Sequence, residues 1–216
     1  MKLEDYKYEH YGQEAVVMGS GPSINGLSEK VLGLLLHDKI TIGCNEIIHF
    51  PRRMDYYFIG DAGNKRRGYN SDPNKYKAYK ATRQNFYRDP LYKATFRKIP
   101  KGLDGVYYPC LFNPSCLLPL AVEEIPPLYD CYSITFEMIQ FAAYSGVQRI
   151  YLVGQDCDYT RGSFHTETVP PWVINHSNKI LESWTLMEKW LTQHYPHIQV
   201  INVNPVKMRR FELFAL

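Results

Sequence analysis

A glycine-rich turn near the start of the chain has residue types suited to binding a phosphate or a nucleotide. It follows the short apolar run 15–18 and reads Gly19-Ser20-Gly21-Pro22-Ser23. Glycine lets the backbone approach a ligand closely, and a helix that begins behind the turn offers free N–H groups to a phosphate. The turn lacks the lysine of a P-loop and the third glycine of the dinucleotide fingerprint. We expect Gly19, Ser20, Gly21 and Ser23 to contact the ligand, unless the segment is only a strand-to-helix turn.

Polar residues also follow three further apolar runs. They are Asn45, Asp61 and Asp156, just beyond the runs 40–43, 56–59 and 149–153. In open α/β sheets the ligand crevice lies at the carboxyl ends of the strands. An asparagine there suits a ribose or a base edge, because it both donates and accepts, although it could equally bond its own backbone in a turn. We expect Asn45, Asp61 and Asp156 to contact the same ligand.

The segment Asp156-Cys157-Asp158-Tyr159 carries two carboxylates that are two residues apart. Together they could hold a divalent metal ion that bridges a diphosphate. Alternatively, Asp156 alone bonds ribose or sugar hydroxyls and no metal is needed. A third interpretation is a solvated turn without a ligand.

A histidine stands directly before a predicted helix, in Asn175-His176-Ser177-Asn178. Imidazole takes up a proton near neutral pH, so His176 is a candidate general base. Taken alone, the position fits equally well with a histidine that only caps the helix or packs on it.

The spacing of apolar and turn residues predicts the elements that position these groups. Buried strands are expected at 15–18, 40–43, 56–59, 106–108, 149–153 and 198–203. One helix is expected behind a Ser23 cap, one from Ser133 to Gly146, and one through Ile180 and Leu191. Strands that alternate with helices predict a doubly wound, mostly parallel α/β sheet.

Residues 64–101 hold twelve of the 25 lysines and arginines, with tyrosines between them. We interpret this stretch as a partly helical surface insertion. It could neutralise an anionic donor or acceptor, grip single-stranded nucleic acid by charge and stacking, or simply be solvated. We predict that 64–101 and the loop 157–175 close over the site as lids.

The composition is that of one globular domain spanning residues 1–216. A net charge of +3 does not indicate a nucleic-acid-binding protein. Five cysteines without a C-x-x-C pair predict reduced thiols rather than disulfides or zinc. No signal peptide or spanning run is present, which predicts a soluble, cytoplasmic protein. The tail 206–216 mixes cations with apolar residues, so it could lie on the inner face of an anionic membrane, pack on the core or contact a second subunit.

The order of these motifs resembles the small bacterial sialyltransferases that use CMP-sialic acid. The shared motifs are G-S-G-P-S, G-C-N, S-G-V-Q-R-I-Y-L-V-G-Q-D at the end of a helix and beyond, and N-H-S before a helix. They lie within 15–60 and 130–204, about half of the chain. A wider group with a similar G-x-G-P-S start includes motility-linked glycosyltransferases and a pterin pyrophosphokinase.

The resemblance implies a Rossmann-like fold of the variant GT-A type and inverting sugar transfer without a metal. It implies that His176 is the catalytic base, that Gly21 and Asn45 contact the nucleotide, and that Asp156 contacts a donor hydroxyl. Ser133 begins Ser133-Ile134-Thr135, where the family has T-S-G. Of the two family tyrosines on the donor phosphate, Tyr159 is the one near its place, and Phe164 and His165 stand where the second would be.

The expected function is therefore transfer of an acidic sugar, a sialic acid or a related ulosonic acid, from a CMP-activated donor to a glycan acceptor. No cofactor is expected for this reaction. One alternative is a pyrophosphokinase that uses ATP, with Mg²⁺ on Asp156 and Asp158. The other is a nucleic-acid-binding or partner-binding module built on 64–101, without enzymatic activity. A homo-oligomer is compatible with all three.

Overall fold

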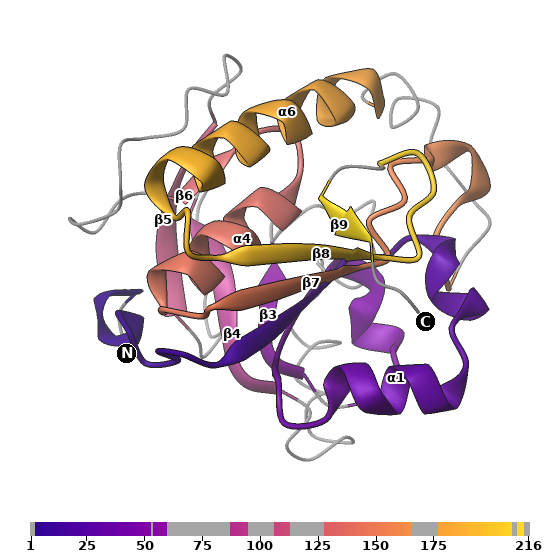
Figure 1. Cartoon of the computed structure of the whole chain (residues 1–216), viewed down its shortest axis with the longest axis horizontal. Helices are drawn as coiled ribbons and strands as arrows, with labels where there is room; N and C mark the ends of the chain where they lie inside the picture. The colour runs from indigo at the N-terminus through magenta and orange to yellow at the C-terminus, as the bar shows by residue number, and fades with distance from the viewer. Residues whose placement is uncertain are drawn as a thin grey trace.

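The computed structural model describes residues 3–52, 54–59, 87–94, 106–112, 128–165, 177–208 and 211–213. Within these residues one sheet of parallel strands runs in the order β6-β5-β4-β3-β2-β1-β7-β8-β9 (Figure 1). The strands are β1 (Glu14–Met18), β2 (Ile40–Cys44), β3 (Met54–Ile59), β4 (Tyr87–Ala94), β5 (Val106–Phe112), β6 (Leu128–Asp130), β7 (Arg149–Val153), β8 (Gln199–Val203) and β9 (Glu212–Leu213). The predicted mostly parallel α/β sheet is confirmed.

The strand order reverses beside β1. From β1 the chain adds β2 to β6 on one side, and it then returns to add β7, β8 and β9 on the other side. Met18, the last residue of β1, lies in register with Gly43 of β2 and Val153 of β7. Because these parallel strands end at nearly the same level, the residues that follow them meet at one edge of the sheet. Ligands of open α/β sheets bind at such a switch point.

Helices cover both faces of the sheet. They are α1 (Glu29–Leu36), α4 (Ile134–Tyr144) and α6 (Ser177–His194), with the 3₁₀ helices η1 (Leu3–Tyr6), η2 (Pro22–Gly26), η3 (Asn45–His49) and η4 (Tyr159–Arg161). Val17 and Leu152 point to the face that α4 and α6 cover, whereas their neighbours Val16 and Val153 point to the face of α1. Figure 1 shows α6 and α1 on opposite sides of the sheet. Period-two alternation of the strands thus builds two cores, one on each face.

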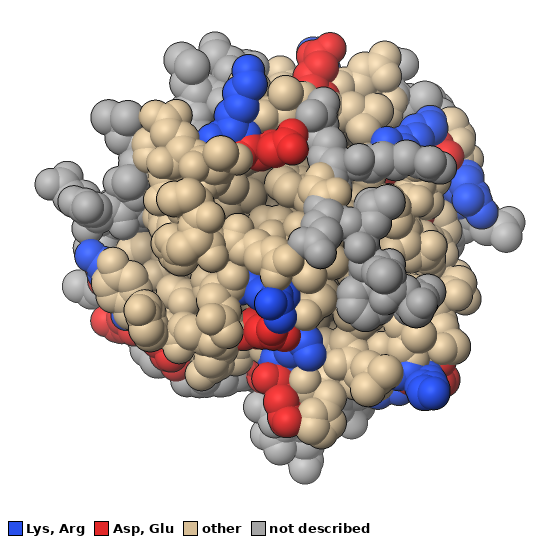
Figure 2. Space-filling view, in the orientation of Figure 1, with Lys and Arg blue, Asp and Glu red and all other residues tan. Residues whose placement is uncertain are grey.

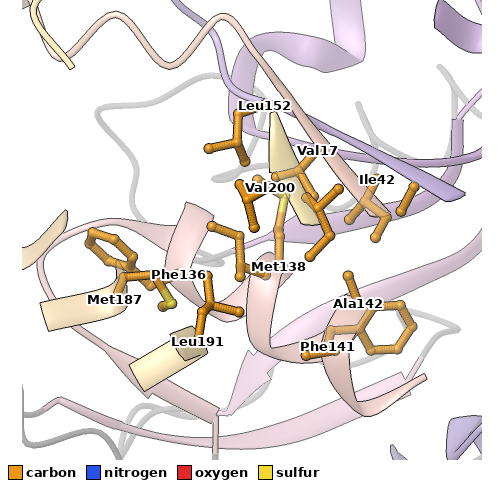
Figure 3. Packing of buried hydrophobic residues seen from close by; sticks show 14 of the residues in the cluster. Val17, Ile42, Phe136, Met138, Phe141, Ala142, Leu152, Met187, Leu191 and Val200 are labelled. Carbon is orange, nitrogen blue, oxygen red and sulfur yellow. The ribbon is translucent and has the colours of Figure 1, made fainter. Parts of the chain in front are cut away.

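Helix α4 lies at the centre of the larger core. Every residue from Thr135 to Tyr144 is buried, and the side chains of the sheet, of α4 and of α6 meet around it (Figure 3). Each fully buried phenylalanine, methionine or isoleucine of this helix stabilises the fold by about 1.5–3 kcal/mol. Ser133 is the N-cap, as the sequence predicted, and the left-handed Gly146 follows the helix end at a φ of 87°.

The start of the first helix differs from the prediction. Ser23 does not cap it, because Ser23 lies inside the short helix η2. The cap of α1 is Ser28, whose hydroxyl accepts the N–H of Val31 at 3.3 Å. The chain therefore makes an additional turn, η2, between the glycines and α1.

The interpretation of 64–101 as a surface insertion is wrong for residues 87–94. They form β4, which lies inside the sheet between β3 and β5. The sequence conceals this strand, because Arg88, Asp89 and Pro90 are residue types that strands disfavour. The rest of 64–101 lies outside the described residues. The predicted role of that part as a lid therefore stays a prediction.

The described part of the tail packs on the core. Met208 is 1% exposed, Phe211 contacts the ring of Trp184 edge-on, and β9 pairs with β8. Of the three sequence-based alternatives for 206–216, contact with the core is the one that the described residues adopt. None of the described helices has the length and apolar character needed to cross a bilayer.

Charged side chains do not gather in a patch of one sign on the face drawn in Figure 2, where basic and acidic groups lie side by side. Arg149 and Lys39, for example, both pair with Glu14. Three cysteines, Cys44, Cys131 and Cys157, are buried free thiols. For these three, the prediction of reduced thiols is confirmed.

Candidate functional site

The glycine turn (residues 19–23) is fastened to the end of β7. The N–H of Gly19 donates to the carbonyl of Val153 at 2.8 Å, and the N–H of Gly21 donates to the carbonyl of Gly154 at 2.9 Å. These two donors are engaged inside the protein. In this arrangement neither N–H is free for a phosphate, and the contact of Gly21 with a ligand stays a prediction.

Asp156 occupies the space beside Gly21. A Cβ atom at Gly21 would lie 2.5 Å from the carboxylate carbon of Asp156, a distance that real Cβ atoms do not tolerate. Asp156 accepts the N–H of Ser23 at 2.9 Å and also the Ser23 hydroxyl. Gly21 and Ser23 thus contact Asp156, and the physical reason for this glycine is the approach of a carboxylate rather than of a ligand.

Burial raises the pKa of Asp156, while the two hydrogen bonds from Ser23 and the nearby Arg161 act in the opposite direction. A carboxylate offers about four acceptor positions, and Ser23 uses two of them. Asp156 therefore keeps acceptor capacity for a further donor, and its contact with a ligand hydroxyl stays a prediction.

Two polar side chains at the switch point have no hydrogen-bond partner among the residues that the structure describes. Within the described residues, neither the Ser20 hydroxyl nor the Asn45 amide makes a hydrogen bond, and both side chains are half-buried. Asn45 follows β2 with a φ of 51°, a left-handed conformation that asparagine tolerates better than most residues. Its carbonyl accepts the Tyr57 hydroxyl, but its side chain does not bond its own turn. Both groups are available to a ligand.

Gln155, between Gly154 and Asp156, is a site residue that the sequence analysis missed. Its Oε1 accepts the hydroxyl of Thr135, in the first turn of α4, at 2.9 Å. Its Nε2 is buried and has no hydrogen-bond partner in the described part of the chain. Its position in the G-Q-D motif could have indicated this role, because Gln155 follows β7 even more closely than Asp156 does.

The start of α4 reaches the same edge of the sheet. The Ser133 hydroxyl caps α4 by accepting the N–H of Thr135 at 3.3 Å. Through the bond between Thr135 and Gln155, the cap of α4 and the end of β7 are held together. Ser133 is thus placed beside the switch point. Its contact with a ligand stays a prediction.

The carboxylates of Asp156 and Asp158 have different hydrogen-bond partners. Asp158 accepts the hydroxyl of Thr160 at 2.7 Å and pairs with Lys207 at 3.0 Å, and these two contacts lower its pKa. Asp156 instead bonds Ser23. Among the described residues no cluster of three or more metal-ligating side chains occurs.

The segment 163–165 lies over the glycine turn. The N–H of Phe164 donates to the carbonyl of Ser20 at 2.9 Å, and the carbonyl of Phe164 accepts the side chain of Asn25 at 3.0 Å. The ring of His165 stacks on that of His49 with 3.9 Å between the centroids. The described part of the loop 157–175 thus covers one side of the turn.

Three predicted site groups lie outside the part of the chain that the structure describes. They are Asp61, the side chain of Tyr159 and His176. Tyr159 itself begins η4, and α6 begins at Ser177. The structure therefore brings together Gly19, Ser20, Gly21, Ser23, Asn45, Ser133 and Asp156, and it adds Gln155 and Thr135.

No family model matches this chain, and no curated protein does. Solved structures do match. The MAf glycosyltransferase from Magnetospirillum magneticum AMB-1 superposes with a TM-score of 0.53 and 16% identity over 99% of this chain. This chain spans 37% of the length of that protein.

A second group of solved structures is the sialyltransferase CstII from Campylobacter jejuni. Its complex with a trisaccharide acceptor and CMP gives a TM-score of 0.52 at 11% identity, covering 88% of this chain and 80% of CstII. The CMP complex of a CstII variant gives 0.53 at 11% identity, with 88% and 81% covered. The α/β fold of this chain is thus similar to the folds of these glycosyltransferases. The resemblance found in the motif order is confirmed at the level of fold.

Proposed function

We propose that this chain is a glycosyltransferase-like enzyme that transfers an acidic sugar, a sialic acid or a related ulosonic acid, from a CMP-activated donor to a glycan acceptor. The observation that carries the proposal is a group of polar side chains at the switch point that have unsatisfied hydrogen-bonding groups within the described part of the chain, in a fold similar to those of glycosyltransferases. These side chains are Ser20, Asn45 and Gln155. Neutral hydroxyl and amide groups suit the hydroxyls and the base edge of a nucleotide sugar.

In this proposal Ser20 and Asn45 bind the ribose or the base of CMP. Gly19 and Gly21 keep their place in the site, but they act by letting the turn pack on the end of β7. Asp156 accepts a donor hydroxyl, and Ser23 orients its carboxylate. The donor thus lies across the carboxyl ends of β2, β1 and β7.

The chemical step would use a base from the segment before α6. The acceptor oxygen attacks the anomeric carbon, and His176 takes the proton of that hydroxyl. The bond from this carbon to the phosphate oxygen breaks, and CMP leaves with the electron pair. The hydroxyl of Tyr159 and the N-terminus of α4 behind Ser133 stabilise the negative charges of the donor.

The proposed reaction needs no metal. Two contacts support this: Asp156 is oriented by Ser23, and Asp158 is neutralised by Lys207. Each carboxylate therefore has a partner of its own inside the protein. A divalent ion on Asp158 would be repelled by the positive charge of Lys207.

Thermal unfolding in the presence of CMP, CDP, UDP, GDP or ATP, each with and without Mg²⁺, tests the proposal. CMP should raise the melting temperature without metal, since a ligand at 100 times its Kd stabilises by about 2.7 kcal/mol. Ser20→Ala should reduce the CMP shift while the ligand-free protein melts as before, because its hydroxyl has no hydrogen-bond partner among the described residues. Asn45→Ala should also reduce the shift, and its ligand-free protein should melt slightly earlier, because alanine tolerates the φ of 51° less well than asparagine. Thr192→Ala, on the exposed surface of α6, is the control that keeps the shift.

Two other results would replace the proposal. A shift only with ATP and Mg²⁺, lost in Asp158→Asn, would identify a pyrophosphokinase. Salt-sensitive binding of oligonucleotides that Asn45→Ala does not weaken would identify a nucleic-acid-binding module.

A further inference from the structure

Gln155 carries a buried hydrogen-bond donor that nothing in the described protein satisfies. The residue is 8% exposed, and its Nε2 atom is buried without a partner. Such groups are rare in folded proteins, because a buried donor that loses water without gaining an acceptor destabilises the fold. A methionine here together with a valine at position 135 would fill the same space without this cost. The amide therefore needs an explanation that the fold alone does not supply.

The orientation of the amide is set by Thr135. The Thr135 hydroxyl donates to Oε1 at 2.9 Å, so the acceptor side of the amide is occupied and the NH₂ group points away from Thr135. The group left unsatisfied is the NH₂ donor. A ligand group that satisfies it must contribute an acceptor oxygen.

The NH₂ group points to the glycine turn. A Cβ atom at Gly19 would lie 2.7 Å from Nε2, so the absence of a side chain at Gly19 makes room for the amide. The N–H of Gly19 cannot accept a hydrogen bond, and it already donates to Val153. The nearby cap of α4 adds the positive end of a helix dipole. The free NH₂ donor thus favours an acceptor oxygen, and the end of α4 favours one that carries negative charge.

We propose that Gln155 is a ligand-binding residue whose Nε2 donates to an anionic oxygen of the bound nucleotide sugar, and that Thr135 is a positioning residue that holds the amide in this orientation. The inference rests on the proposed function. The oxygen belongs to the phosphate of the nucleotide or to the carboxylate of the sugar, which have the same acceptor chemistry. Because Nε2 is buried in the ligand-free protein, the glycine turn shifts when the ligand enters.

Binding of CMP and of CMP-sialic acid to the full chain, measured by calorimetry, distinguishes the two oxygens. Gln155→Met should weaken binding by about tenfold or more, the usual effect of losing a hydrogen bond to a charged group. If the variant binds both ligands more weakly, the acceptor of the Gln155 hydrogen bond is the phosphate. If it binds only CMP-sialic acid more weakly, the acceptor is the carboxylate of the sugar. Gln155→Glu should weaken binding further, since it replaces the donors with a negative charge.

The ligand-free variants separate this role from a structural one. In Thr135→Val/Gln155→Met neither partner is left unsatisfied, so the ligand-free protein should melt no earlier than the parent while its affinity falls as in Gln155→Met. Thr135→Val alone should fold and bind more weakly than the parent, since the amide is then free to turn. If the double variant melts earlier yet binds both ligands with parental affinity, the Gln155 amide has a structural role, for example a hydrogen bond to a buried water. That result would overturn the inference. If the parent binds neither ligand, the proposed function itself fails and Gln155 loses this role with it.

Discussion

Gly21 illustrates how one missing side chain shapes the site. Its φ of −65° and ψ of 144° are open to any residue, so glycine is not required by backbone conformation. It is required by space, because the carboxylate of Asp156 and the carbonyl of Gly154 occupy the region where a Cβ would lie. The close approach lets Asp156 reach Ser23 and ties the glycine turn to β7.

Gly21→Ala should therefore destabilise the protein even without ligand. Overpacking of this kind costs about 1–3 kcal/mol, and urea unfolding measures it. Gly33→Ala is the matched control, since Gly33 lies inside α1 and no atom lies within 4 Å of the place where its Cβ would stand. That variant should gain up to about 1 kcal/mol from helix propensity. Equal stability of Gly21→Ala and the parent would show that Asp156 is held loosely.

At the level of single residues, the sequence located the site better than it assigned roles within it. The position of Gly19, Asn45 and Asp156 behind apolar runs was sufficient to place all three at one edge of the sheet. The partner of each group depends on contacts between residues far apart in the chain, such as Ser23 with Asp156 and Thr135 with Gln155. No spacing rule encodes those contacts, so Gln155 went unnoticed.

The prediction of strands from the sequence shows a similar limit. Strands β1, β2, β7 and β8 were predictable because a buried parallel strand is a short apolar run between turn residues. β4 was not, since its residues include charges and a proline, and it is a strand because β3 and β5 flank it. β6 and β9 are three and two residues long, too short for a periodic pattern.

The tail is an element whose stability contribution can be tested. Met208 is buried, and its carbonyl accepts the side chain of Asn202 at 2.6 Å. Met208→Ala should lower the free energy of unfolding by about 2–5 kcal/mol, the range for a buried methionine. Leu34→Ala, at a position 64% exposed, should change it by less than about 0.5 kcal/mol. Parental stability of Met208→Ala in urea would mean that the tail contributes little to the core and is available for other contacts.

At the scale of the whole molecule, chain segments from both halves of the sheet converge on one edge. β1 and β2 deliver the glycine turn and Asn45, and β7 delivers Gln155 and Asp156. α6 connects the carboxyl end of β7 to the amino end of β8, so it begins at this same edge and ends at the opposite one (Figure 1). A catalytic group just before α6 is therefore compatible with the topology.

His176, the residue before α6, is the group proposed to take the acceptor proton. His176→Ala should lower the rate of sugar transfer by about 10²–10⁴-fold, the usual contribution of a positioned base. CMP binding should stay nearly unchanged, because the base contacts the acceptor rather than the nucleotide. The parental rate should also fall at acid pH, since a protonated imidazole has no free nitrogen to accept the proton. His194→Ala, in the last turn of the same helix, is the matched control and should keep the rate.

A His176→Ala protein that melts earlier but transfers sugar at the parental rate would reduce this histidine to a helix cap. Loss of transfer in His165→Ala instead would move the base to the stacked pair of His165 and His49 above the glycine turn.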